Sequence, residues 1–145
     1  MLHSNCGRLK RAHAQILFNA TEKRGKFTIT EREYYASALE HYNKSLGALR
    51  ERKHFPEVWD RISWELSGTY FTVGTLAQDY CTKEETEAER EISDVLFKSL
   101  KYCEGLVFPN EDLQRDVQHR IGSIHFRLAS LYHNSYRMIV SLKCI

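Results

Sequence analysis

Hydrophobic and polar positions alternate along most of the chain with the period of an α-helix. Between Tyr34 and Leu49, apolar side chains recur every three or four residues, which places them along one face of a helix. No segment shows the two-residue alternation that is typical of a β-strand. The pattern therefore predicts an all-α protein, with helices at about 9–24, 30–53, 56–80, 82–105 and 110–136.

Local sequence signals mark where several of these helices begin. Thr30 precedes Glu33 by three residues, and Thr82 precedes Glu85 by the same spacing. This spacing is typical of a capping box, in which the threonine and glutamate side chains bond the unpaired N–H groups of the first turn. Pro56 suits the first turn of a helix because its fixed φ matches the helical value.

A nine-residue pattern occurs twice, in Leu66–Gly74 and again in Ile121–Ala129. Both copies read apolar, small, two free positions, aromatic or imidazole, Phe, polar, apolar, small. A shorter phrase, Lys44-Ser45-Leu46, returns as Lys98-Ser99-Leu100. The offsets of 55 and 54 residues agree, which indicates a stacked helical repeat.

The repeat resembles the tetratricopeptide motif, in which small residues let paired helices A and B approach and large residues fill the gaps between them. The family's repeats are about 34 residues long, whereas these repeat after 54 to 55. His125 occupies the aromatic position of its copy, so we expect it to pack against a neighbouring helix. The positions that match are Leu66, Ser67, Tyr70, Gly74, Ile121, Gly122, His125 and Ala129 for helix A, Ala38, Tyr42, Ser45, Ile92, Leu96 and Ser99 for helix B, and more weakly Ala12, His13 and Ile16.

The resemblance predicts a single tetratricopeptide-like array over residues 1–145. It contains two full helical hairpins at 9–53 and 56–105, a fifth helix at 110–136 and an irregular tail at 137–145. Arrays of this kind usually bind other proteins.

A closer resemblance covers most of the chain. Segments such as Val58-Trp59-Asp60, Phe71–Leu76, Lys98–Cys103 and Arg127–His133 are similar to the erythroid differentiation-related factor 1 family. The resemblance implies a part of a large nuclear protein with tetratricopeptide-like repeats that takes part in transcriptional regulation of globin genes. It also implies that the chain is a fragment or a short form.

Composition and charge narrow the class of protein. The chain has 145 residues, 42% of them hydrophobic and 28% charged, which is typical of one globular domain. Its net charge of +2 is too small to indicate nucleic-acid binding by itself. No apolar run reaches the length of a membrane helix. The start of the chain lacks a secretory pattern and the four cysteines form no close pair, so we expect an intracellular setting, and a nuclear one from the resemblance.

Catalytic motifs are missing from the sequence. It contains no phosphate-binding glycine loop and no nucleophile elbow, so we expect neither catalysis nor a cofactor. Cys103 lies on an apolar stripe, which favours a buried thiol over a nucleophile. His119, His125 and His133 are six and eight residues apart, not the four that places two histidines on one helix face, so we expect no metal site.

The repeat register places aromatic and arginine side chains on the inner face of the array, where they predict a groove for a protein or peptide partner. Aromatic residues and arginine are enriched at binding hot spots, and arginines in a groove can pair with acidic groups on a bound helix or extended peptide. Two interpretations of Trp64 stay open, since it either faces this groove or packs on the neighbouring hairpin. The candidate groove residues are Arg61, Trp64, Phe71, Thr72, His119, Phe126 and Arg127.

Two alternatives to a binding scaffold remain open. A nucleic-acid-binding module needs one contiguous basic face, which Arg8, Lys10 and Arg11 would form with the basic run at 50–53. That run also fits the negative end of a helix dipole. The other alternative is a purely structural segment that stacks within a larger solenoid.

Overall fold

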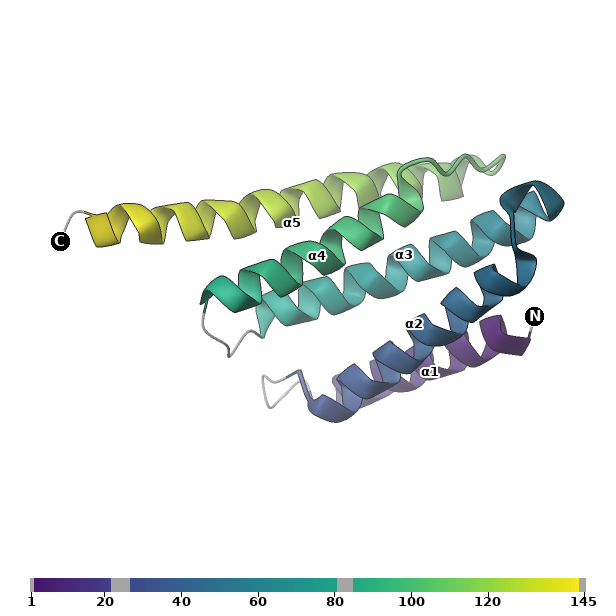
Figure 1. Cartoon of the computed structure of the whole chain (residues 1–145), viewed down its shortest axis with the longest axis horizontal. Helices are drawn as coiled ribbons and strands as arrows, with labels where there is room; N and C mark the ends of the chain where they lie inside the picture. Colours follow the sequence, from purple (N-terminus) through teal and green to yellow (C-terminus); the bar gives the residue numbers. More distant parts are fainter. Residues whose placement is uncertain (1, 22–26, 81–84, 144–145) are drawn as a thin grey trace.

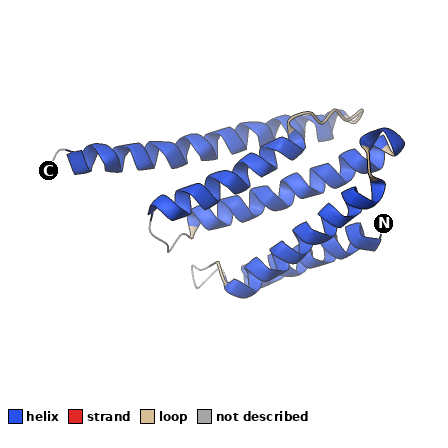
Figure 2. Ribbon diagram, viewed as in Figure 1, coloured by secondary structure: helices blue, strands red, loops and turns tan. Residues whose placement is uncertain are grey.

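The computed structural model describes residues 2–21, 27–80 and 85–143. These residues form an all-α fold without a β-strand, as the sequence predicts (Figure 2). Two antiparallel hairpins, α1–α2 and α3–α4, stack side by side, and α5 covers the far side of the second hairpin (Figure 1). The elements are α1 (Leu2–Thr21), α2 (Ile29–Leu49), the short 3₁₀-helix η2 (Arg52–His54), α3 (Pro56–Asp79), α4 (Glu85–Cys103) and α5 (Glu111–Lys143).

The N-terminal cap of α2 lies two residues before the predicted one. Thr28, not Thr30, caps the helix, and its side-chain oxygen accepts a hydrogen bond from the backbone N–H of Glu31 at 3.3 Å. Phe27 is buried immediately before the cap and fixes where the chain enters the helix. Most of the second predicted capping box falls on residues 81–84, outside the described residues.

The C-terminal end of α2 also differs from the prediction. The helix ends at Leu49 rather than at 53, because Arg50 adopts a φ of 64° that no right-handed helix accommodates. The N–H of Glu51 then bonds the carbonyl oxygen of Leu49 at 2.8 Å, which closes a three-residue turn. The basic run at 50–53 therefore lies in this turn and in η2, not in the last turn of the helix.

The fifth helix is longer than predicted. It continues to Lys143, so the expected irregular tail at 137–145 is wrong over its described part. The sequence contains no proline or glycine after Gly122, so nothing in this region terminates a helix. Ser135 hydrogen-bonds Glu89 near the start of α4, and the residues beyond it project past the hairpin (Figure 1).

Burial confirms the two repeat offsets. Tyr42 in α2 and Leu96 in α4, 54 residues apart, are both fully buried. In the helix A series, Thr69 and Ile124 are both fully buried at an offset of 55. The same offset extends back to α1, where Ala14 is fully buried.

The positions predicted for α1 are wrong by one residue. An offset of 54 residues leads to the predicted positions Ala12, His13 and Ile16. All three residues are exposed. The buried residues of α1 include Gly7 and Ala14, which correspond to positions 62 and 69 of α3. A slip of one residue turns a helical side chain by about 100°. This rotation is enough to move a residue from the buried face to the exposed one.

Candidate functional site

A groove runs between α3 and α5, in which two cavities adjoin. The larger is about 580 Å³ and the smaller about 290 Å³, and both are lined by Phe71, His119 and Ser123. We call this feature the α3–α5 groove. Its remaining lining residues are Gln118, Gly122, Phe126 and Arg127 in the larger cavity, and Trp64, Asp116 and Arg120 in the smaller one.

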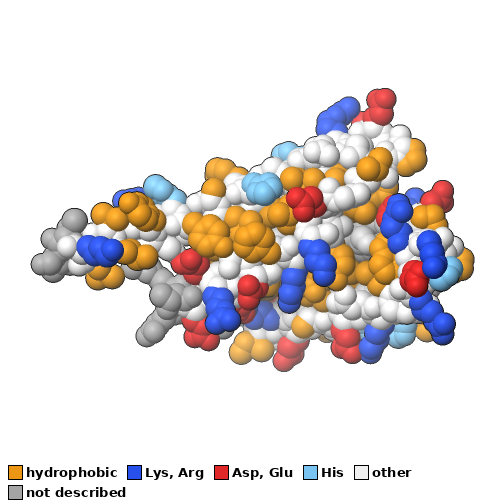
Figure 3. Space-filling model, turned by 45° about the horizontal axis from the view of Figure 1, so that its top comes forward, with side chains coloured by type: hydrophobic (Ala, Val, Ile, Leu, Met, Phe, Trp, Pro, Cys, Tyr) orange, Lys and Arg blue, Asp and Glu red, His pale blue; other side chains and the backbone are white. Residues whose placement is uncertain are grey.

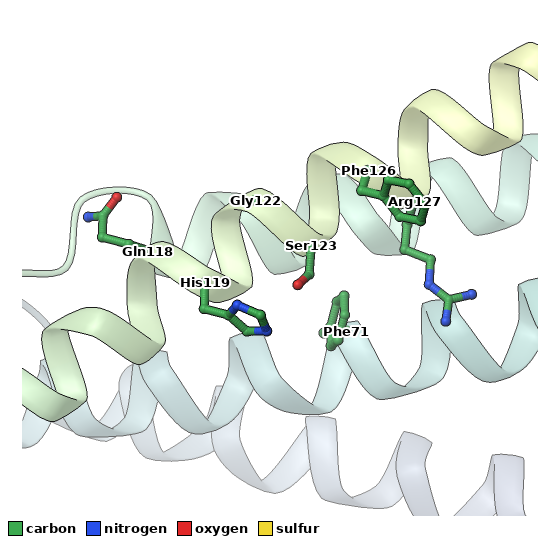
Figure 4. A pocket seen from close by; sticks show the side chains of 7 residues that line it. All are labelled: Phe71, Gln118, His119, Gly122, Ser123, Phe126 and Arg127. Carbon is green, nitrogen blue, oxygen red and sulfur yellow. The ribbon is translucent and has the colours of Figure 1, made fainter.

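Aromatic side chains form the floor and rim of the larger cavity. Phe71 is half-buried, packs against the core formed by α3, α4 and α5, and points from α3 toward α5 (Figure 4). Phe126 lies across the cavity on α5 with 73% of its surface exposed. His119 and Ser123 supply polar atoms on the α5 side (Figure 4). The cavity thus combines an apolar base with a few hydrogen-bonding groups, as binding sites commonly do.

Trp64 is held at the smaller cavity by Arg120. The guanidinium carbon of Arg120 lies 3.4 Å from the centre of the Trp64 ring, and Nη1 of Arg120 donates a hydrogen bond to the Trp64 carbonyl oxygen at 3.0 Å. The rings of Phe108 and Trp64 meet edge to face, with their centres 6.4 Å apart. Both interpretations of Trp64 therefore apply, because it packs on α5 and also lines the groove.

Arg120 is a cation in an unusually buried position. Burial, and to a smaller extent the nearby Arg11, lower the pKa of Arg120 to about 10. The side chain still carries its charge at neutral pH. The Arg11 guanidinium is balanced by Glu65, with Nη1 of Arg11 at 2.9 Å from Oε2.

Gly68 makes room for both arginines. A Cβ atom at this position would lie 2.9 Å from Nη2 of Arg11 and 3.2 Å from Nη2 of Arg120. The two guanidinium groups therefore approach the backbone of α3 from two other helices. The sequence analysis did not predict this role for Arg11, Gly68 and Arg120. A signal was present for two of them, since Gly68 is the third residue of the first repeated phrase and Arg120 comes just before the second.

Arg127 already pairs with an acidic residue of the chain. Its Nη1 lies 2.5 Å from Oδ1 of Asp79, and its carbonyl oxygen accepts a hydrogen bond from Gln78 at 3.3 Å. These contacts tie α5 to the end of α3. Arg127 lines the groove, but its charge is neutralised within the chain, so it is not the free cation that the sequence suggested for an acidic partner.

Two of the predicted groove residues lie elsewhere. Arg61 is exposed and lines a separate cavity of about 620 Å³ with Pro56, Val107 and Phe108. It lies ten residues before Phe71, about 15 Å along the helix. The Thr72 hydroxyl donates to the carbonyl oxygen of Gly68 at 2.9 Å and lines neither cavity of the groove.

The buried thiol predicted for Cys103 is confirmed. Cys103 is fully buried, and this burial raises the pKa of its thiol. The packing predicted for His125 is wrong, since its side chain is exposed and none of the described helices covers it. Within the described ranges, no group of three or more His, Cys, Asp and Glu side chains is close enough to hold a metal ion.

Several of the basic residues in α1 and after the end of α2 take part in ion pairs. Arg11 pairs with Glu65, and Arg52 bonds both carboxylate oxygens of Asp60 at 2.7 and 2.8 Å. Lys53 pairs with Glu51 at 2.7 Å. These pairs neutralise three of the six residues of the basic face that a nucleic-acid-binding module would need. None of the described helices is both long enough and apolar enough to cross a membrane.

The chain is similar to proteins of one known family. The model of a family described as erythroid differentiation-related factor 1-like, TPR repeats, matches residues 1–143. Proteins named erythroid differentiation-related factor 1 from Homo sapiens and Mus musculus are 43% and 41% identical to the chain over 141 residues. The match covers 94% of this chain but only 11% of each relative. No solved structure matches the chain.

Proposed function

The chain belongs to the erythroid differentiation-related factor 1-like family of tetratricopeptide repeats, and from that premise we propose that it is a non-catalytic protein-binding module whose α3–α5 groove receives a peptide segment of a partner. The observation that carries this proposal is the open aromatic cavity between Phe71 and the exposed Phe126. A cavity that is lined by aromatic side chains and a few hydrogen-bonding groups is the usual form of a binding site.

The charges of the groove favour an apolar anchor over an acidic one. Arg127 is neutralised by Asp79, and Arg120 is occupied by the ring and carbonyl group of Trp64. An aliphatic or aromatic side chain of the partner would bury apolar surface between Phe71 and Phe126. Ser123 and His119 would then hydrogen-bond the backbone of the bound segment, as in other helix or extended-peptide grooves.

The setting of the whole protein is a further part of the proposal. The relatives carry a name that refers to erythroid differentiation, and the chain spans 11% of the length of the human and mouse proteins. We propose that the segment serves within a nuclear protein that takes part in transcriptional control. The family resemblance supports this setting, and the groove supplies a way for the segment to contact other proteins.

One pair of variants tests the groove. Ser123→Arg places a long cation between Phe71 and Phe126, whereas Ser130→Arg makes the same change two turns further along α5, away from both cavities. Peptides are selected from a displayed random library on the wild-type chain, and their dissociation constants are measured for all three proteins. We expect apolar peptides whose affinity falls about tenfold or more with Ser123→Arg and stays unchanged with Ser130→Arg.

The same variants address the nuclear setting. Affinity capture from a nuclear extract should yield proteins that bind the wild type and Ser130→Arg but not Ser123→Arg. Selected peptides that bind both variants equally would disprove the groove. Captures that do not distinguish the three proteins would instead favour a structural segment of a larger solenoid.

A further inference from the structure

The first hairpin brings two histidines from different helices into direct contact. His3 lies at the start of α1 and His41 in the second half of α2, and their Nδ1 atoms are 3.1 Å apart. The two rings stack with their centres 5.4 Å apart. Figure 3 shows histidine side chains spread over several parts of one face of the molecule. In the part of the chain that the structure describes, no other two histidine rings are in contact, and we call these two the histidine pair.

The separation of the two nitrogen atoms suits a shared metal ion. Nitrogen ligands lie about 2.0–2.1 Å from Zn²⁺, so two of them on one ion are about 2.9–3.4 Å apart, depending on the angle between their bonds. The observed 3.1 Å falls within this range. Imidazole nitrogen suits Zn²⁺, Ni²⁺ and Cu²⁺ alike. Because His3 is exposed, its ring is free to turn its Nδ1 lone pair toward such an ion.

A packed contact next to the histidine pair holds its two helices together. Gly7 lies one turn after His3 in α1, and a Cβ atom there would be 3.0 Å from Cε1 and Cζ of Tyr42. Tyr42 directly follows His41 in α2 and is fully buried. The backbones of α1 and α2 therefore stay close at this level of the folded hairpin. A site that is in place before its ligand arrives loses little conformational entropy on binding.

The remaining ligands of an ion at the histidine pair would be water molecules. Glu40, beside His41, already pairs with Lys44 at 2.7 Å. Within the described ranges, no third His, Cys, Asp or Glu side chain is close enough to join the two histidines on one ion. Closed structural zinc sites have four protein ligands, whereas sites with fewer keep positions open to water. The histidine pair thus has the form of an exchangeable metal site rather than a permanent one.

We propose that His3 and His41 bind one divalent transition-metal ion through their Nδ1 atoms and so connect α1 to α2. Two bonds from nitrogen to the metal replace the hydrogen bond between the rings. The ring that donates this hydrogen bond releases its Nδ1 proton and takes up a proton at Nε2, so both imidazoles stay neutral. The sequence does not reveal the site, because 38 residues separate the two histidines. Neither histidine lines the α3–α5 groove, so the site is independent of peptide binding there.

Calorimetric titration of the full chain with Ni²⁺ is the first test. Ni²⁺ is preferred to Zn²⁺ because free thiolates compete more strongly for zinc. We expect one ion per chain, with an affinity that falls about tenfold or more in His3→Gln and in His41→Gln. His54→Gln changes an exposed histidine of η2 and should bind Ni²⁺ like the wild type. Equal affinities of the wild type and His3→Gln, or no binding up to about 1 mM Ni²⁺, would overturn the proposal.

Thermal unfolding tests whether the ion connects the two helices. A ligand that binds the folded chain in preference to the unfolded one raises the melting temperature. Saturating Ni²⁺ should therefore raise the melting temperature of the wild type and of His54→Gln by about 5 °C, and leave His3→Gln and His41→Gln unchanged. Melting curves without Ni²⁺ show that each variant is folded. An equal rise in all four proteins would mean that the ion binds elsewhere, which contradicts the proposal.

Discussion

Gly74 of α3 lies so close to Leu96 of α4 that a Cβ atom on the glycine would come within 2.7 Å of Leu96 Cδ2 and 3.0 Å of Cγ. Carbon atoms that are not bonded to each other normally stay about 3.5–4.0 Å apart. Leu96 is fully buried, so its side chain would have to shift within the core to make room for that atom. The second repeat therefore depends on the absence of a side chain at this position.

We expect Gly74→Ala to destabilise the protein. Alanine favours a helix over glycine by about 1 kcal/mol, but overpacking a buried contact costs about 1–3 kcal/mol. The free energy of unfolding in urea should therefore fall. Gly47→Ala in α2 is the matched control, because a Cβ atom there meets nothing within 4 Å, and it should raise stability. Equal stabilisation by both substitutions would contradict the close contact.

The stacking of Arg120 on Trp64 predicts that a substitution of Arg120 lowers the stability of the protein and shifts its tryptophan emission. Arg120→Lys keeps the charge but removes the planar group above the indole ring, which should cost about 1 kcal/mol. Tryptophan emission should also shift to longer wavelength as the ring becomes more exposed to water. Arg115→Lys on the exposed side of the same helix should change neither quantity. Unchanged emission in Arg120→Lys would argue against the stacking.

The backbone of Arg50 predicts a stabilising substitution. Its φ of 64° lies in the left-handed region, which glycine adopts without steric cost and other residues avoid. Arg50→Gly should therefore stabilise the protein by about 1 kcal/mol, seen as a higher melting temperature. Arg50→Ala removes the same side chain but keeps the Cβ atom, so it should give no such gain. Equal melting temperatures for the two variants would disprove the strain.

Tyr42 predicts how stability changes at alkaline pH. Burial, and to a smaller extent the nearby Glu65, raise the pKa of Tyr42 from an ordinary value of 10 to about 12. The unfolded chain therefore releases this proton first, so the contribution of Tyr42 to stability is complete below pH 10 and is lost as the pH rises toward 12. Arg120, whose pKa is lowered to about 10, acts in the opposite direction above that pH.

A comparison with Tyr42→Phe isolates this contribution. Unfolding midpoints in urea, measured at several pH values from 9 to 11, should decline less steeply for the variant than for the wild type. The decline should not vanish, because burial also raises the pKa values of Tyr35 and Tyr102. Parallel pH profiles would show that Tyr42 titrates alike in the folded and unfolded states.

The periodic spacing of apolar residues was enough to predict the helices and most of their pairing. The apolar stripes of Tyr42 and Leu96 predicted buried faces that the structure confirms. The repeated phrases predicted that α3 and α5 bury matching positions. The structure confirms this for Thr69 and Ile124 but not for Gly74 and Ala129, because Gly74 is buried and Ala129 is exposed. These features depend on spacing along one helix, and the sequence records that spacing directly.

The register of α1 and the ends of α2 needed the tertiary structure. The α1 helix has apolar residues on more than one face, and only its contact with α2 selects the face of Gly7 and Ala14. Thr28 and Thr30 are both followed by glutamate after three residues, so the sequence offers two equivalent caps. Burial of Phe27 decides between them.

Five of the seven predicted groove residues line the α3–α5 groove, because the repeat register places whole helix faces correctly. The contacts among them are not a property of any one helix. Arg120 meets Trp64 across 56 residues of sequence, and Arg127 meets Asp79 across 48. The sequence by itself thus determined the helices, the repeat and the faces they share. The tertiary structure alone decided which side chains neutralise, stack on or expose one another, because these contacts depend on how closely separate helices approach.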